Sequence, residues 1–144
     1  MPTPNQKRMI KHINATVFKL LKDYHFDEIT IQKICDIAEI NRSTFYRYFQ
    51  DKYDLLFSLP DYIATQFQHE VTRPFVPTEE SFQQFIYFIG DHKKVFKHLL
   101  TSSRQADVFR NLTHVSRELM LDSVENQNDP LALKIKHSHH PEII

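Results

Sequence analysis

The sequence predicts an all-α protein in which three N-terminal helices are joined by a long fourth helix to a short C-terminal helical domain. Two observations support this fold class. Apolar residues recur at helical spacing along most of the 144 residues, and no stretch of useful length alternates as a strand does. The hydrophobic share of 41% and the 12 Phe and 6 Tyr are enough for a well-packed aromatic core.

The N-terminal half divides into four helices. The first covers Asn5 to Tyr24, with a single apolar stripe along one face. Thr30 is placed to cap a short second helix, and Asn41 a short third helix. Asp51 caps the longer fourth helix, which runs to about residue 71.

The C-terminal half follows a proline-containing linker over residues 73–78. The fifth helix spans residues 78–89, and Gly90 is expected to close it as a C-terminal cap. Its inward residues are expected to be Phe82, Phe85, Ile86 and Ile89. A sixth helix is predicted over residues 91–101 and a seventh over 104–124. These helices suggest domains at residues 1–56 and 57–126.

The expected third part, residues 127–144, is a polar tail without a fixed fold. His137, His139 and His140 lie in it, but no Cys or acidic partner at a set spacing accompanies them. We therefore predict no metal site.

Composition excludes several classes of enzyme. A single glycine rules out the P-loop, the dinucleotide-binding fingerprint and the nucleophile elbow. Cys35, the one cysteine, permits no internal disulfide and is expected to be inert core. No apolar run approaches the ~20 residues that span a bilayer. We expect a cytoplasmic protein that is not an enzyme, has no cofactor and does not enter a membrane.

The third helix carries the clearest chemical pattern. Four polar residues share the face opposite Phe45 and Phe49: Arg42, Ser43, Tyr46 and Arg47. Arginine pairs with guanine in the major groove, while hydroxyl groups donate to bases or phosphates. Together with the short helix before it, this helix has the layout of a helix-turn-helix. The alternative is an ordinary solvated polar face.

Net charge is zero, which alone does not indicate a nucleic-acid partner. Residues 1–56 hold nine Lys or Arg against seven Asp or Glu, whereas residues 57–144 hold nine against eleven. The difference between the halves is small. The positions of the basic residues are therefore more informative about DNA binding than the net charge.

Residues 30–56, TIQKICDIAEINRSTFYRYFQDKYDLL, resemble the N-terminal DNA-binding domain of the TetR family of bacterial transcriptional regulators. The likeness extends over residues 5–72. It implies phosphate contacts from four residues: Thr30, Tyr46, Tyr48 and Lys52. It implies contacts to base edges from four others: Arg42, Ser43, Thr44 and Arg47.

The sequence departs from this family at two positions that usually hold glycine, His25 and Glu39. Histidine is among the residues enriched at left-handed backbone angles, whereas glutamate fits them poorly. We therefore expect the turn at Glu39 to be either strained or more helical.

The resemblance also implies a small-molecule effector pocket and a homodimer. Five aromatic residues are candidates for the pocket lining, with ordinary core packing as the alternative: Phe82, Phe85, Tyr87, Phe88 and Phe96. The final pair of helices through which the family usually dimerises has no counterpart after about residue 126. Either the protein pairs through another surface or it is a shortened derivative. If the protein pairs through another surface, we expect that surface to be the seventh helix, with Phe109, Leu119 and Met120.

These observations predict a sequence-specific regulator of double-stranded DNA, acting as a repressor that a small apolar or aromatic effector releases. The alternative is a helical interaction module, a coactivator or a truncated regulator, which keeps the fold without binding DNA.

Overall fold

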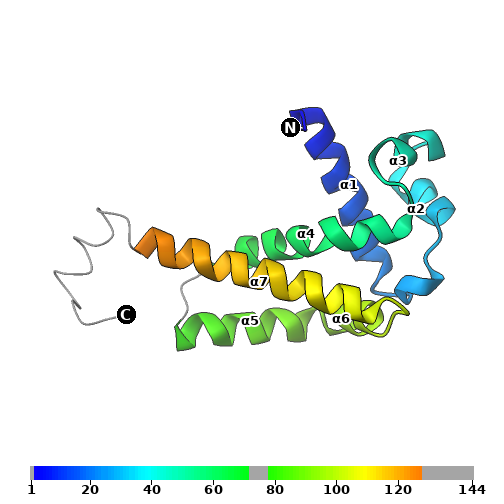
Figure 1. The fold of residues 1–144 in the computed structure, drawn as a ribbon. Helices are drawn as coiled ribbons and strands as arrows, with labels where there is room; N and C mark the ends of the chain where they lie inside the picture. Colours follow the sequence, from blue (N-terminus) through cyan, green and yellow to red (C-terminus); the bar gives the residue numbers. More distant parts are fainter. Residues whose placement is uncertain (1, 72–77, 128–144) are drawn as a thin grey trace.

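The computed structural model describes residues 2–71 and 78–127, with the backbone alone for residues 123–127. In these residues the chain forms seven α-helices, two short 3-10 helices and no strand, as the sequence predicts (Figure 1). In chain order they are α1 (Pro4–Leu20), η1 (Phe26–Glu28), α2 (Ile31–Ala38), α3 (Arg42–Tyr48), η2 (Lys52–Asp54), α4 (Leu55–Glu70), α5 (Glu79–Asp91), α6 (Lys93–Leu100) and α7 (Gln105–Gln127).

Side-chain caps explain where several helices begin. Thr3 forms a capping box with Gln6 at the start of α1. Thr30 accepts a hydrogen bond from a backbone N–H of α2, and Asp51 accepts two from η2, which leads directly into α4. Asn41 occupies the cap position of α3, as predicted, but its side chain makes no capping hydrogen bond.

The buried residues form one continuous cluster that runs from Ile13 in α1 to Val108 in α7. Helix α4 lies at its centre, because α1 packs on one part of it while α5 and α7 pack on another (Figure 1). Fully buried rings of Phe26, Phe45 and Phe67 fill the cluster. The division at residue 56 stays a prediction, since the core continues across it.

The predicted inward face of α5 is wrong for Phe82 and Ile86. Phe82 and Ile86 are 62% and 51% exposed, whereas Phe88 is only 3% exposed. The reason is the position of α4: the Phe67 ring meets Phe85 and Phe88 edge to face, with centroids 5.4 Å apart in both pairs. Phe85 and Ile89 belong both to the predicted stripe and to the observed face, since both are half-buried and line the cavity among α4 to α7.

The end of α5 is also later than predicted. Gly90 lies inside the helix with a negative φ and does not cap it. The backbone N–H of His92 continues the helical pattern by donating to the carbonyls of Phe88 and Ile89. A Cβ at position 90 would meet nothing within 4 Å, so no close approach requires glycine there.

The two positions where the family usually has glycine differ in the structure. His25 has an extended backbone, with φ −66° and ψ 150°, and begins η1. Left-handed geometry is therefore not needed there. Glu39 adopts φ 57° and ψ 48° between α2 and α3, so the turn is strained rather than more helical.

Replacing Glu39 with glycine should stabilise the protein by about 1 kcal/mol, because glycine adopts the left-handed conformation without a Cβ clash. Urea unfolding of the two proteins measures the difference. Glu39→Ala is the matched control: alanine keeps the Cβ, so it should not reproduce the gain. An equal gain from alanine would assign the effect to the lost carboxylate instead.

The connection between α6 and α7 meets the turn after α1. Asp27 accepts hydrogen bonds from the Ser103 backbone N–H at 2.8 Å and from its hydroxyl at 3.0 Å. His98 Nδ1 lies 2.6 Å from the Leu21 carbonyl oxygen. These contacts join the C-terminal helices to the segment that leads into α2.

Candidate nucleic-acid interface

Helix α3 is held in place by aromatic residues on one side. Phe45 is fully buried and Phe49 is 6% exposed, and their ring centroids are 5.3 Å apart. Helix α2 packs against α3, and the turn between them is only Glu39, Ile40 and Asn41. Two short helices joined by so tight a turn form a helix-turn-helix, with α3 as the second helix.

The opposite side of α3 faces solvent. Four of the predicted site residues are exposed together, as their spacing indicates: Arg42, Ser43, Tyr46 and Arg47. Thr44 and Tyr48 are half-buried on the flanks of this face. Their contacts with DNA stay predictions.

Arg42 and Tyr46 form a small polar network with α2. The Arg42 guanidinium donates to the Tyr46 hydroxyl at 3.3 Å and to Gln32 Oε1 at 3.2 Å. Gln32 also donates to Asp36 Oδ1 at 2.8 Å. The sequence analysis did not identify Gln32, because its separation of ten residues from Arg42 gives no periodic signal. Only its position on the exposed side of α2 could have suggested a place beside the DNA-binding face.

Arg47 differs from Arg42 in its hydrogen-bond partners. In the described part of the chain its exposed guanidinium has no hydrogen-bond or ion-pair partner. It can therefore meet a DNA base without giving up a protein contact.

Of the other two residues with a predicted phosphate contact, Thr30 is exposed and Lys52 is half-buried. Thr30 Oγ1 accepts from the Lys33 N–H at 3.0 Å, so the hydroxyl caps α2 and keeps its own hydrogen free to donate. The Lys52 ammonium points to backbone carbonyls of the η1 segment. Burial lowers the pKa of Lys52, and the Asp27 carboxylate partly opposes this.

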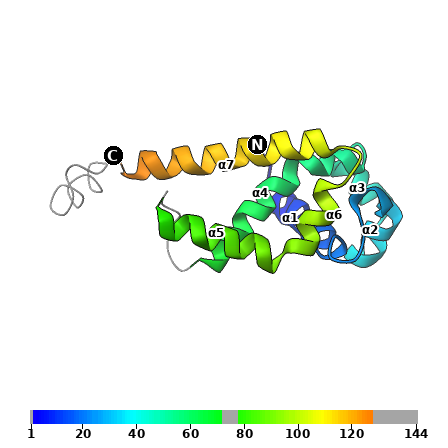
Figure 2. The same cartoon turned by 90° about the horizontal axis from the view of Figure 1, so that it is seen from below.

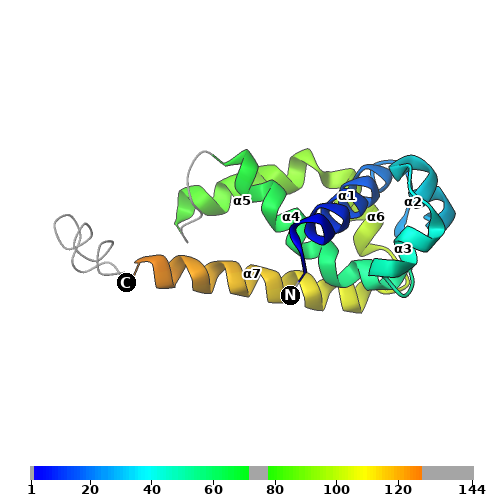
Figure 3. The ribbon, with the colours of Figure 1, turned by 90° about the horizontal axis from the view of Figure 1, so that it is seen from above.

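A second candidate site is an apolar cavity of about 320 Å³ among α4, α5, α6 and α7. Figures 2 and 3 show α5 on one side of α4 and α7 on the other. Three of the predicted aromatic residues line the cavity: Phe85, Phe88 and Phe96. Phe109 lines it from α7.

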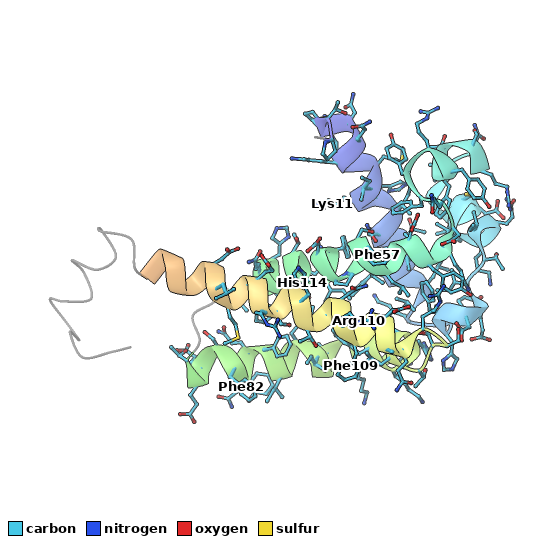
Figure 4. All side chains as sticks on the ribbon, viewed as in Figure 1. Lys11, Phe57, Phe82, Phe109, Arg110 and His114 are labelled. Carbon is cyan, nitrogen blue, oxygen red and sulfur yellow. The ribbon has the colours of Figure 1, made fainter. Side chains whose placement is uncertain are left out.

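The other two predicted pocket residues lie elsewhere. Phe82 lines a neighbouring apolar hollow with Met120 (Figure 4 labels Phe82 on α5 and Phe109 on α7). Tyr87 is 60% exposed and borders a third, more polar hollow beside Glu70 and Asp91. The rotation of α5 relative to the predicted face accounts for the placement of Phe82, whereas Tyr87 lies outside both the predicted stripe and the observed inward face.

Other sequence predictions bear on metals, thiols and membranes. Across residues 2–71 and 78–127, no group of three or more His, Cys, Asp or Glu side chains is arranged to hold a metal ion. His137, His139 and His140 lie outside the described residues.

Cys35 is buried, which raises the pKa of its thiol. None of the described helices is long and apolar enough to cross a membrane.

Comparison with known proteins supports the helix-turn-helix. Residues 15–59 match the family model described as bacterial regulatory proteins, tetR family. The match begins within α1, includes all of α2 and α3, and ends within α4. No curated protein and no solved structure matched the chain. Residues 15–59 therefore form a helix-turn-helix domain similar to the DNA-binding domain of the tetR family of bacterial regulatory proteins.

Proposed function

We propose that the protein is a cytoplasmic repressor that binds operator DNA as a homodimer and is released by a small apolar or aromatic molecule. The solvent-facing side of α3 supports DNA binding. Two arginines and two side-chain hydroxyl groups lie together there, opposite the buried rings of Phe45 and Phe49. In the major groove, Arg42, Ser43, Thr44 and Arg47 contact base edges.

Phosphate contacts position α3 on the duplex. Tyr46 and Tyr48 reach phosphates from the sides of α3, and Thr30 donates its free hydroxyl hydrogen from the start of α2. Lys52, at the start of η2, adds a fourth phosphate contact, for which its ammonium exchanges a hydrogen bond to a carbonyl of the η1 segment.

The DNA-binding proposal is tested by the salt dependence of binding. If the basic side chains of each subunit neutralise about three or four phosphates, the affinity of a dimer should fall with a log-log slope of about −6 in salt. Mobility shift on promoter DNA at several salt concentrations measures the slope. No complex at micromolar protein and low salt would contradict the proposal and favour an interaction module that keeps the fold.

The effector proposal is supported by the cavity among α4 to α7. Its walls are aromatic and aliphatic, with hydroxyl groups of Thr113 and Ser116 as polar positions. Thermal shift screening of apolar, aromatic, sugar and phosphate compounds tests this ligand class. Stabilisation by sugars or phosphates alone would contradict it.

A connection between the cavity and the DNA-binding helices supports release by an effector. Phe96 and Leu100 of α6 line the cavity, and Ser103, which follows α6, is bonded to Asp27 next to α2. A ligand that displaces α6 would therefore move the segment on which α2 is built. Ser103→Ala should weaken the effect of the ligand on DNA affinity, measured as the ratio of Kd values with and without ligand.

Pairing is proposed through α7. Phe109 and Met120 are 59% and 46% exposed, and Leu119 is partly buried against the core. Two half-sites about 34 Å or more apart require a two-fold dimer for specific affinity. Sedimentation at micromolar concentration should show a dimer that Met120→Glu weakens. A monomer would contradict pairing.

A further inference from the structure

The apolar cavity among α4 to α7 and the neighbouring hollow beside Phe82 adjoin along α7. Each has a volume of about 320 Å³. Four residues belong to the walls of both: Phe67, Phe85, Ser116 and Leu119. Ser116 has the smallest side chain of the four and lies where the two hollows meet. The two hollows therefore form one groove.

This groove is elongated. On α7 its wall runs from Phe109 through Ser116 to Met120, a distance of about 16 Å at the rise of an α-helix. Phe82 and Phe109, both labelled in Figure 4, line different ends of it. A compact ring fills one hollow and leaves the other empty, whereas a chain occupies both.

The lining of the groove carries no charge. Among the described residues that line the two hollows there is no Asp, Glu, Lys, Arg or His. Ile63 and Phe67 of α4 form the floor and are 5% and 2% exposed. An ionised group buried here would lose its hydration without gaining a partner. The buried part of an occupant is therefore apolar and uncharged.

The edges of the groove are exposed apolar side chains. Phe82, Phe109 and Met120 are 62%, 59% and 46% exposed. Apolar side chains that gather around a groove indicate a surface that an apolar partner covers. An α-helix about 10 Å across and 16 Å long occupies more than about 1,000 Å³, so it is too wide to enter the groove. An alkyl chain can enter it and contact all three side chains.

We propose that the groove binds the unbranched alkyl chain of a soluble, uncharged amphiphile, such as a fatty alcohol, along α7 from Phe109 to Met120. The proposal rests on the effector function proposed above and specifies its ligand. The length of the chain, rather than aromatic character, sets the affinity. DNA binding by α3 does not depend on it.

A series of linear alkanols from hexanol to dodecanol tests the proposal on the full-length protein by calorimetric titration. Kd should fall about threefold with each added CH₂, slightly less than for complete burial, because the groove is open on one side. Naphthalene, a compact aromatic, should bind no more tightly than hexanol. A Kd that stops falling after hexanol, or tighter binding of naphthalene than of dodecanol, would overturn the proposal and leave the effector function intact. If none of these compounds binds, both fail.

Met120→Gln tests the second hollow, because Met120 lines that hollow and not the first. Dodecanol should bind about tenfold more weakly to this variant, while the Kd of hexanol, held in the first hollow, stays unchanged. Leu121→Gln is the matched control: Leu121 is 53% exposed and is not among the described residues that line either hollow. Equal weakening of hexanol and dodecanol by Met120→Gln, or no weakening of dodecanol, would overturn the proposal.

The wild-type protein allows two measurements that need no variant. The NMR signal of the Met120 methyl group should shift on addition of dodecanol and not of hexanol, and an unchanged signal with dodecanol would overturn the proposal. Phosphatidylcholine vesicles distinguish a soluble amphiphile from a bilayer lipid. The protein should stay in the supernatant when the vesicles are sedimented, whereas sedimentation with them would overturn the choice of a soluble amphiphile.

Discussion

Replacing Phe45 with alanine should destabilise the protein by about 3–5 kcal/mol, which is the typical cost of truncating a fully buried phenylalanine. Phe45 is 0% exposed and is the buried centre of α3. Its ring packs at 5.3 Å from Phe49 and edge to face at 5.6 Å from Tyr46. A helix of seven residues is too short to persist without this packing, so α3 should lose its structure.

Urea unfolding followed by circular dichroism measures the loss, and mobility shift should show that DNA binding is lost with it. Tyr46→Ala is the control for stability. Tyr46 is adjacent but 45% exposed, so its loss should change stability by only about 0.5 kcal/mol while still weakening DNA binding. Similar destabilisation by both variants would contradict the assignment of Phe45 as the buried anchor.

Local signals made the helix-turn-helix predictable. The Thr30 cap and the four-residue spacing of Phe45 and Phe49 are short-range features, and each has the predicted place in the structure. Asp51 caps η2, which precedes α4, rather than α4 itself. The exposed face of α3 follows directly from the same periodicity. For the turn at Glu39 the sequence predicted either strain or a more helical backbone. It could not choose between them, because the packing of α2 on α3 decides the φ angle of Glu39.

The face of α5 was not predictable from spacing. Phe82, Phe85 and Ile86 form one helical stripe, and Ser81, Phe85 and Phe88 form another. Local periodicity fits both stripes. The choice depends on the position of Phe67 in α4 and of α6, which are distant in the sequence.

The hydrogen-bond partners of Lys52 were not predictable for a similar reason. Its place at the start of a helix indicated an anion, since the N-terminus of a helix attracts negative charge. Its actual partners are carbonyls from the η1 segment, and no local pattern links residues 52 and 26. Long-range hydrogen bonds of one side chain leave no periodic trace, and Gln32 on Arg42 is a second example.

The two arginines of α3 should differ in their effect on DNA binding. Arg42 is already bonded to Gln32 and Tyr46, so it must exchange these contacts for a base. Arg47 has no protein partner among the described residues and exchanges only water. A base contact by Arg47 therefore retains more of its hydrogen-bond energy.

Arg47→Ala should accordingly cost about 1–3 kcal/mol per subunit on the operator, and Arg42→Ala less. Titration of the operator, of single-base variants and of random duplex separates base-specific contacts from the nonspecific attraction of a positive charge to the DNA backbone. Arg47→Ala should relax the preference at one base pair of each half-site, while affinity for random DNA falls far less. Lys22→Met removes a charge away from α3 and should leave the preference unchanged. Equal losses on operator and random duplex in Arg47→Ala would show that Arg47 contacts the backbone rather than a base.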